Sequence, residues 1–177
     1  TGNIETLQWL DFTDASLISI GGTTKCSGLQ LTSPSATFTG DVTSSFFVHI
    51  HKTKATFASD LNLTGNNVFI IRGSSDVSVK NLSSSTYLDV LNSKLTATGN
   101  VTTTLYSTFS NANVSVGGDF TTAQTSFREL STVDIKGNLS AKMMWISYAS
   151  DITVENNLKC ADYIDILNLS TDANYAT

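Results

Sequence analysis

The chain has 177 residues, a net charge of −5 and charged side chains at only 14 % of its positions. Ser, Thr and Asn are abundant and proline occurs once, a composition that favours pleated β structure over helix. The two arginines and the scattered lysines form no basic cluster, so nucleic acid and anionic membranes are poor partners. No apolar run predicts a membrane span, and no charged-then-apolar leader is present.

Short segments of alternating apolar and polar residues predict strands along the whole chain. In chain order, one group of strands is marked by Leu10/Phe12, Val48/Ile50, Leu88/Val90 and Ile164/Ile166. A second group, which begins each repeated phrase, is marked by Val114/Val116 and Ile152/Val154, and the phrases are 36–45, 55–64, 77–85, 95–104, 114–123, 133–142 and 152–161.

A column of Asn and Asp residues gives the period of this repeat. Steps of 19 residues separate its members, except for one step of 21 that indicates a small insertion near Asn66 and Asn67. Two further steps of 19 extend the column backwards through Gly22 to Asn3. The members are Asn3, Asp41, Asp60, Asn81, Asn100, Asp119, Asn138 and Asn157.

Each repeat predicts one turn of a coil. The Gly-Asx pair marks a bend where positive φ is tolerable, and small polar corners such as 92–94, 111–113 and 149–151 close the unit. We therefore expect an all-β fold, a parallel β-solenoid of about nine coils over residues 1–177, roughly 43 Å long at the usual strand spacing. An antiparallel sandwich would need hairpin signals and would not explain a constant period.

Units of the form V-x-V-x-G-N-[LVF]-[ST], as in 114–123 and 133–142, resemble the right-handed β-helices of large surface-exported adhesins. The filamentous-haemagglutinin type and autotransporter passenger domains are the closest comparisons, and the resemblance extends from about Asn3 to Asp172. It implies a right-handed coil, export to the cell surface or extracellular space, and a role in adhesion or display. The chain has fewer Gly and Ala than such repeats carry and lacks their secretion-domain signatures.

Three groups of polar residues are candidate sites, and each has a structural interpretation. The Asx column is expected to form a stacked ladder and not a calcium site, because few of its members are carboxylates in adjacent coils. His49 and His51 are expected on one outward face about 7 Å apart, too few for a closed zinc site. Cys26 and Cys160 are seven repeats apart, so no disulfide can join them within one coil stack, and both are expected to be buried.

Six tripeptides match the N-glycosylation signal, but three of them lie in the Asx column and follow from the repeat itself. Glycosylation is therefore a possibility only in a eukaryotic secretory route. The six asparagines are Asn62, Asn81, Asn100, Asn113, Asn138 and Asn168.

Polysaccharide-degrading β-helices are the rival functional class, and they need facing carboxylates or a base beside bound calcium. Asp162 and Asp165 are three residues apart, and Arg128 and Glu129 form a lone charged pair. We expect neither pair to form a constellation across adjacent coils. The sequence therefore predicts no catalytic, cofactor-binding or metal-binding residue.

Ice binding is a third functional class, because a flat solenoid can present rows of Thr. The position two after the Asx forms one such row, but Asn62 and Lys159 interrupt it. A second parallel Thr row is not evident from the sequence. The row consists of Thr24, Thr43, Asn62, Ser83, Thr102, Thr121, Ser140 and Lys159.

The sequence thus favours a non-enzymatic structural or adhesive protein, with polysaccharide binding or degradation as the alternative. Neither the opening residues nor the segment after Leu169 reads as a cap over the terminal coils. We therefore expect end-to-end stacking with flanking coils or other copies, and possible partners are cell-surface glycans or proteins.

Overall fold

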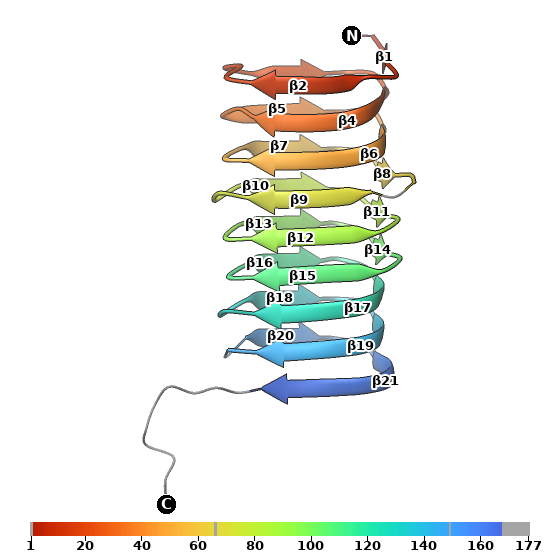
Figure 1. Cartoon of the computed structure of the whole chain (residues 1–177), viewed down its shortest axis with the longest axis vertical. Coiled ribbons are helices and arrows are strands. Elements are labelled where there is room, and N and C mark those ends of the chain that lie inside the picture. Colours follow the sequence, from red (N-terminus) through yellow and green to blue (C-terminus); the bar gives the residue numbers. More distant parts are fainter. Residues whose placement is uncertain (1, 66, 149, 168–177) are drawn as a thin grey trace, which may run out of the picture.

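The computed structural model of the chain describes residues 2–65, 67–148 and 150–167. It is a parallel β-solenoid of about nine turns, about 19 residues apart, which confirms the predicted fold class. Every strand pairing is parallel. In Figure 1 the near strands run to the left, the fainter far strands run to the right, and each coil lies below the previous one, so the coil is right-handed.

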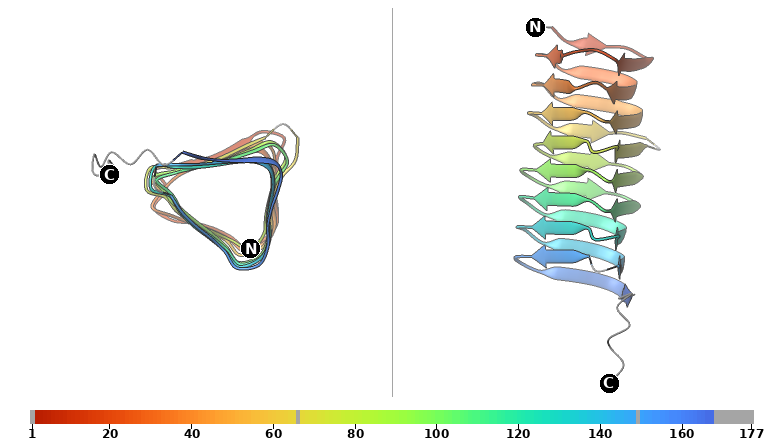
Figure 2. Two further views of the ribbon diagram at one scale, coloured as in Figure 1. Left: turned by 90° about the horizontal axis from the view of Figure 1, so that it is seen from below. Right: turned by 90° about the vertical axis from the view of Figure 1, so that its left-hand side faces the viewer.

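Each coil has three sides, and the view along the axis in Figure 2 is a triangle. One side is an eight-stranded sheet. We call it the hydroxyl face, because Ser and Thr fill its central outward column. Its strands are β3 (Ile18–Ile20), β5 (Ser35–Phe38), β7 (Lys54–Phe57), β10 (Asp76–Val79), β13 (Lys94–Ala97), β16 (Asn113–Val116), β18 (Thr132–Ile135) and β20 (Asp151–Val154).

The other two sides belong to one bent sheet. The aromatic face, named for its outward rings, has the strands β2 (Trp9–Thr13), β9 (Val68–Arg72), β12 (Tyr87–Leu91) and β15 (Tyr106–Ser110). The short-strand face has β1 (Ile4–Glu5), β8 (Leu61–Leu63), β11 (Leu82–Ser84) and β14 (Val101–Thr103). Five long strands bend and contribute to both: β4 (Thr24–Thr32), β6 (Val42–His51), β17 (Phe120–Arg128), β19 (Leu139–Ser147) and β21 (Leu158–Leu167).

Alternation fills the interior of the triangle. In β13 the side chain of Leu95 is fully buried while Thr96 beside it faces outward, and the same pattern recurs in β16 and β18. Phe38 stacks on Phe57 behind the hydroxyl face with ring centroids 5.0 Å apart, and Phe109 stacks on Phe127 behind the aromatic face at 5.4 Å. Aromatic stacks therefore support both faces from inside.

The Asx column is a structural ladder, as predicted. The Asn100 N–H donates to Oδ1 of Asn81 at 2.8 Å, and the Asp119 N–H donates to Oδ1 of Asn100 at 2.9 Å. Asn138 continues the ladder onto Asp119. Each side chain thus satisfies a backbone donor one coil further on, where a bend leaves that donor without a sheet partner.

One position of the predicted column is wrong. Ile4 pairs with Thr24, and Thr24 pairs with Val42, so steps of 20 and 18 place Thr23 and not Gly22 in the column. The Thr23 N–H accordingly donates to Oδ1 of Asn3. The step of 20 and the step of 18 add up to two steps of 19. A uniform period therefore places Asn3 correctly in the column but assigns Gly22 in place of Thr23. The insertion of two residues lies between 63 and 68, where it was expected.

The reason for glycine before the Asx also differs from the prediction. Positive φ occurs at Gly65 and Gly73, but not at the glycines of the Gly-Asx pairs. A Cβ on Gly118 would instead lie 2.2 Å from Oδ1 of Asn100, and one on Gly99 would lie 2.1 Å from Oδ1 of Asn81. Glycine is required at these positions because the Asx side chain of the preceding coil lies against the glycine and leaves no room for a Cβ.

A second, inward ladder lies at the corner between the aromatic and hydroxyl faces. The backbone N–H groups of Ser33, Thr53 and Ser75 donate to the hydroxyl of the next coil, at 3.0–3.3 Å. Ser75 Oγ also donates to the carbonyl of Arg72 at 2.6 Å. These buried hydroxyls explain the small polar corners of the repeat, because an apolar side chain would leave the donors unpaired.

Candidate functional site

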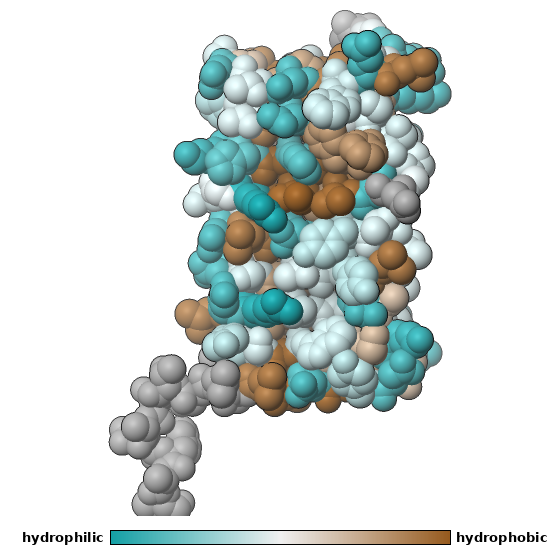
Figure 3. All heavy atoms as spheres, viewed as in Figure 1, coloured by the Kyte–Doolittle hydropathy of each residue, from teal (hydrophilic) through white to brown (hydrophobic). Residues whose placement is uncertain are grey.

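The aromatic face carries three outward columns that differ from the repetitive exterior elsewhere. Strand register places Trp9, Phe47, Tyr87, Tyr106 and Tyr163 in the first column. All the tyrosine and tryptophan residues within the described ranges lie on this face or at its edge: Trp9, Tyr87, Tyr106, Trp145, Tyr148 and Tyr163. Figure 3 looks onto this face, where brown, white and teal side chains alternate over short distances.

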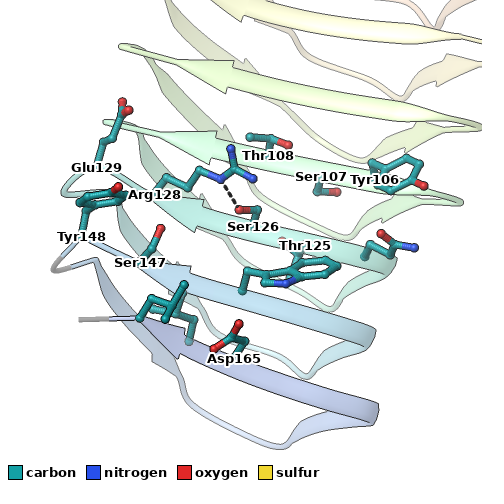
Figure 4. Close-up of a pocket in the computed structure, with 14 residues that line it drawn as sticks. Tyr106, Ser107, Thr108, Thr125, Ser126, Arg128, Glu129, Ser147, Tyr148 and Asp165 are labelled. Carbon is teal, nitrogen blue, oxygen red and sulfur yellow. Dashed lines mark hydrogen bonds between the residues drawn. The ribbon is translucent and has the colours of Figure 1, made fainter. Parts of the chain in front are cut away.

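A hollow of about 560 Å³ lies on the lower part of this face, over β15, β17, β19 and β21. Rings from Tyr106, Trp145 and Tyr148 line it together with charged and hydroxyl side chains (Figure 4). The Trp145 ring meets the Tyr163 ring edge to face, with centroids 5.5 Å apart and planes at 86°. The volume of the hollow is within the range of sites that hold small ligands.

Three charged residues considered from the sequence lie around the hollow. Arg128, Glu129 and Asp165 all line it, but β19 lies between β17 and β21, so Asp165 is two coils away from the other two. The register explains this result: Ser126, Trp145 and Asp165 form one outward column, and Arg128 is two residues beyond Ser126. A step of 20 residues at the bulge between β19 and β21 sets the position of Asp165, and a uniform period of 19 hid this neighbourhood.

Neighbours hold these charged side chains in place. Arg128 Nε donates to Ser126 Oγ at 2.6 Å, and Ser110 Oγ donates to the Glu129 carboxylate. Asp162, the other predicted acidic candidate, is instead 3.7 Å from Lys142 Nζ and does not line the hollow. Oriented charges at a concave surface can recognise a polar ligand with little reorganisation.

Left-handed backbone recurs at the corner of the coil beside the hollow. Glu129, Leu130 and Tyr148 have φ values of 52°, 60° and 57°, in the left-handed region. At the same corner of earlier coils the left-handed residue is Lys52, Ser74, Asn92 or Asn111. This conformation therefore belongs to the repeat and does not by itself mark the hollow as a functional site.

The two histidines share the outward side of β6, as predicted, but their surroundings differ. His49 lies between Gln30 and Ile70 in the register, and its ring is 4.7 Å from the Phe47 ring. Burial, and secondarily the Arg72 guanidinium, lower the pKa of His49 below its ordinary value. The described residues contain no cluster of three or more His, Cys, Asp or Glu side chains that could hold a metal ion.

Arg72 and Asp89 form the best-defined ion pair of this face. The Nη2–Oδ2 distance is 2.6 Å, and the side chain of Asp89 is only 10 % exposed. The repeat did not predict this pair, because the two residues are 17 apart and not 19. The pair lies on adjacent strands β9 and β12.

Both cysteines are free thiols, and one expectation about them is wrong. Cys26 is buried as expected, and burial raises the pKa of its thiol. Cys160 is only partly buried, because it lies in the last described coil.

The Thr row proposed for the short-strand face also needs correction. Thr24 is buried, and Lys25 takes the outward position in its place. A longer hydroxyl row lies on the hydroxyl face, interrupted once by Asp134. Charged residues such as Lys54, Asp76 and Lys94 flank this row. It consists of Ser19, Thr37, Thr56, Ser78, Thr96, Ser115, Asp134 and Thr153.

The glycosylation signals fall in different environments. Asn81, Asn100 and Asn138 use their side chains in the Asx ladder. Asn113 is exposed at the start of β16, and Asn62 is half-buried on β8. Asn168 lies outside the described residues.

Comparisons with protein-family models, with curated proteins and with solved structures find no match for this chain. The resemblance to surface adhesins therefore depends on the repeat and the β-solenoid architecture alone. In the described part of the chain, no helix is long and apolar enough to cross a membrane.

Proposed function

We propose that this chain is a rigid, non-enzymatic β-helical element of a cell surface or extracellular structure that adheres to a partner through its aromatic face. The observation that carries the proposal is the one-sided distribution of the described Tyr and Trp residues. Aromatic residues and arginine are enriched in binding interfaces, because their large side chains bury much area at low entropic cost. Outward positions of the other two faces carry mainly Ser, Thr, Asn, Lys and Asp.

The solenoid supports this role mechanically. Its ladders connect every coil to the next through backbone hydrogen bonds, Asx side chains and buried hydroxyls. Side chains on one face therefore keep fixed spacings, which lowers the entropic cost of binding an extended partner. End-to-end contact between copies remains a further prediction. The exposed fractions of Ile164 and Ile166, 42 % and 66 %, leave apolar surface for it on the last described strand.

Polysaccharide degradation is the second candidate, because Glu129 and Asp165 both line the hollow. Hydrolysis of a glycosidic bond requires a general acid and a second carboxylate on opposite sides of that bond. The Glu129 carboxylate instead accepts a hydrogen bond from Ser110 of the preceding coil, and Asp165 lies two coils away from it.

Two assays on the same preparation test the proposal. Fluorescent beads coated with the protein are applied to surfaces carrying polysaccharides, extracellular-matrix proteins or intact cells, and retained beads are counted. The soluble protein is incubated with the same polysaccharides, and release of reducing ends or unsaturated products is measured. We expect retention without turnover. Turnover that disappears in Glu129→Gln or Asp165→Asn would establish the degrading function, and beads retained nowhere would refute adhesion.

A further inference from the structure

The hollow on the aromatic face has a ring-lined wall. The exposed fractions of Tyr106 and Tyr148 are 44 % and 48 %, so part of each ring is available to a ligand. Trp145 is held edge to face against Tyr163 and therefore presents a surface of fixed orientation. Flat, partly exposed rings of this kind pack against the C–H faces of sugar rings, whose hydrogens are attracted to the negative π surface.

Donors and acceptors surround these rings. The Arg128 guanidinium keeps donors beyond the one that it gives to Ser126, and the carboxylates of Glu129 and Asp165 are acceptors. Thr108, held by the Tyr87 hydroxyl at 3.4 Å, adds a group that can both donate and accept. Sugar hydroxyls also do both, so this mixed set matches them better than it matches an apolar ligand.

Charge selects among sugars. One cationic and two anionic side chains make the hollow slightly acidic, on a chain whose net charge is −5. A polyanion such as a uronate polymer would be repelled, and a lone arginine is a poor phosphate site. A neutral sugar chain meets no such penalty.

The length of the hollow fits a short chain rather than one sugar. It extends over the four adjacent strands β15, β17, β19 and β21, which at the usual strand spacing is roughly 14 Å along the solenoid axis. A polymer running along this axis would continue past the hollow towards Tyr87, which is 6.5 Å from the Tyr106 ring.

We infer that this hollow is a binding site for a neutral oligosaccharide segment, with Trp145 and Tyr106 as the stacking surfaces and Arg128 and Asp165 as the hydroxyl-binding groups. This inference rests on the proposed adhesive function and gives the chemical class of the partner. The step is binding alone, with no bond made or broken.

Fluorescence of Trp145 tests the site directly. The chain has two tryptophans, so Trp9→Phe leaves Trp145 as the only one. This variant is titrated with cello-, manno-, xylo-, malto- and laminarihexaose. We expect at least one to change the emission saturably at concentrations up to about 10 mM, which would fill even a millimolar site. No change with any of them, or a response only to oligogalacturonate or oligochitosan, overturns the inference.

Calorimetry with the hexasaccharide that binds supplies the matched controls. Trp145→Ala and Asp165→Asn should each lower its affinity about tenfold or more, and Trp9→Ala, on the same face but far from the hollow, should change it by less than about twofold. Thermal unfolding shows that each variant is folded. Asp165→Asn decides the case if Trp145→Ala fails to fold. Wild-type affinity in both hollow variants would overturn the site.

The bead assay separates this inference from the proposed function. Beads that adhere through the aromatic face, with adhesion unaffected by the hexasaccharides and by Trp145→Ala, would leave adhesion standing and overturn the sugar site. Saturable binding at Trp145 by a protein whose beads adhere nowhere would retain the site and refute adhesion.

Discussion

The aromatic and hydroxyl faces are built on the same coils and yet differ on the outside. Behind both of them the interior contains aromatic stacks, Phe38 on Phe57 and Phe109 on Phe127. Outside, the hydroxyl face repeats Ser or Thr in almost every coil, whereas the aromatic face changes from Trp9 to Tyr87 to Trp145. Stability constrains the interior of both faces equally, so the variation outside the aromatic face points to recognition.

The largest effects on stability are expected in the interior, which we expect to be equivalent behind the two faces. Phe57→Ala behind the hydroxyl face and Phe127→Ala behind the aromatic face each remove a ring that is at most 1 % exposed. Both should lower the free energy of unfolding by about 3–5 kcal/mol, because the cavity cannot collapse between stacked strands. Chemical denaturation measures both. A loss confined to one of the two faces would show that their interiors are not equivalent.

Breaking an ion pair should lower the free energy of unfolding by less than the core substitutions do, and by different amounts on the two faces. Asp89→Asn on the aromatic face breaks a pair whose acid is 10 % exposed, and we expect a loss of about 1–2 kcal/mol. The control is Asp134→Asn on the hydroxyl face, where the carboxylate is 3.2 Å from Lys136 and both side chains are well exposed. Denaturation should not detect this control, since exposed pairs contribute little. Equal losses of unfolding free energy in the two variants would contradict the claim that the buried pair on the aromatic face contributes more than the exposed pair.

The smallest effect concerns pH. Burial, and then Arg72, lower the pKa of His49 in the folded state, so the unfolded chain binds this proton more readily. Stability is therefore complete above the ordinary histidine pKa of about 6.5 and is lost as the pH falls from there through the folded pKa. Phe47, Gln30 and Ile70 surround His49 and carry no charge.

The measurement is thermal unfolding against pH for the wild type, His49→Gln and the control His51→Gln. His49→Gln should show a smaller decrease in melting temperature towards acid than the wild type. His51→Gln should follow the wild type. A slope unchanged by His49→Gln would mean that other groups determine the acid sensitivity.

Sequence reasoning reached the architecture but missed the site, and both outcomes have physical causes. The Asx ladder needs the same residue type in each coil, so the period of the repeat can be recognised in the sequence. Some coils are one residue longer or shorter than 19, as at Thr23 and at the bulge before Tyr163. A uniform period cannot predict these deviations. The position of Asp165 in the hollow depends on that bulge, which no sequence pattern predicted.

The most direct test of recognition through the aromatic face uses one substitution on each face. Thr108→Lys on β15 and Thr96→Lys on β13 place the same bulky cation at half-buried outward threonines of one coil. Each should change stability by less than about 0.5 kcal/mol. In the bead assay, Thr108→Lys should reduce adhesion about tenfold while Thr96→Lys leaves it unchanged. Equal adhesion by the two variants, or a loss confined to Thr96→Lys, would contradict the claim that the aromatic face binds the partner.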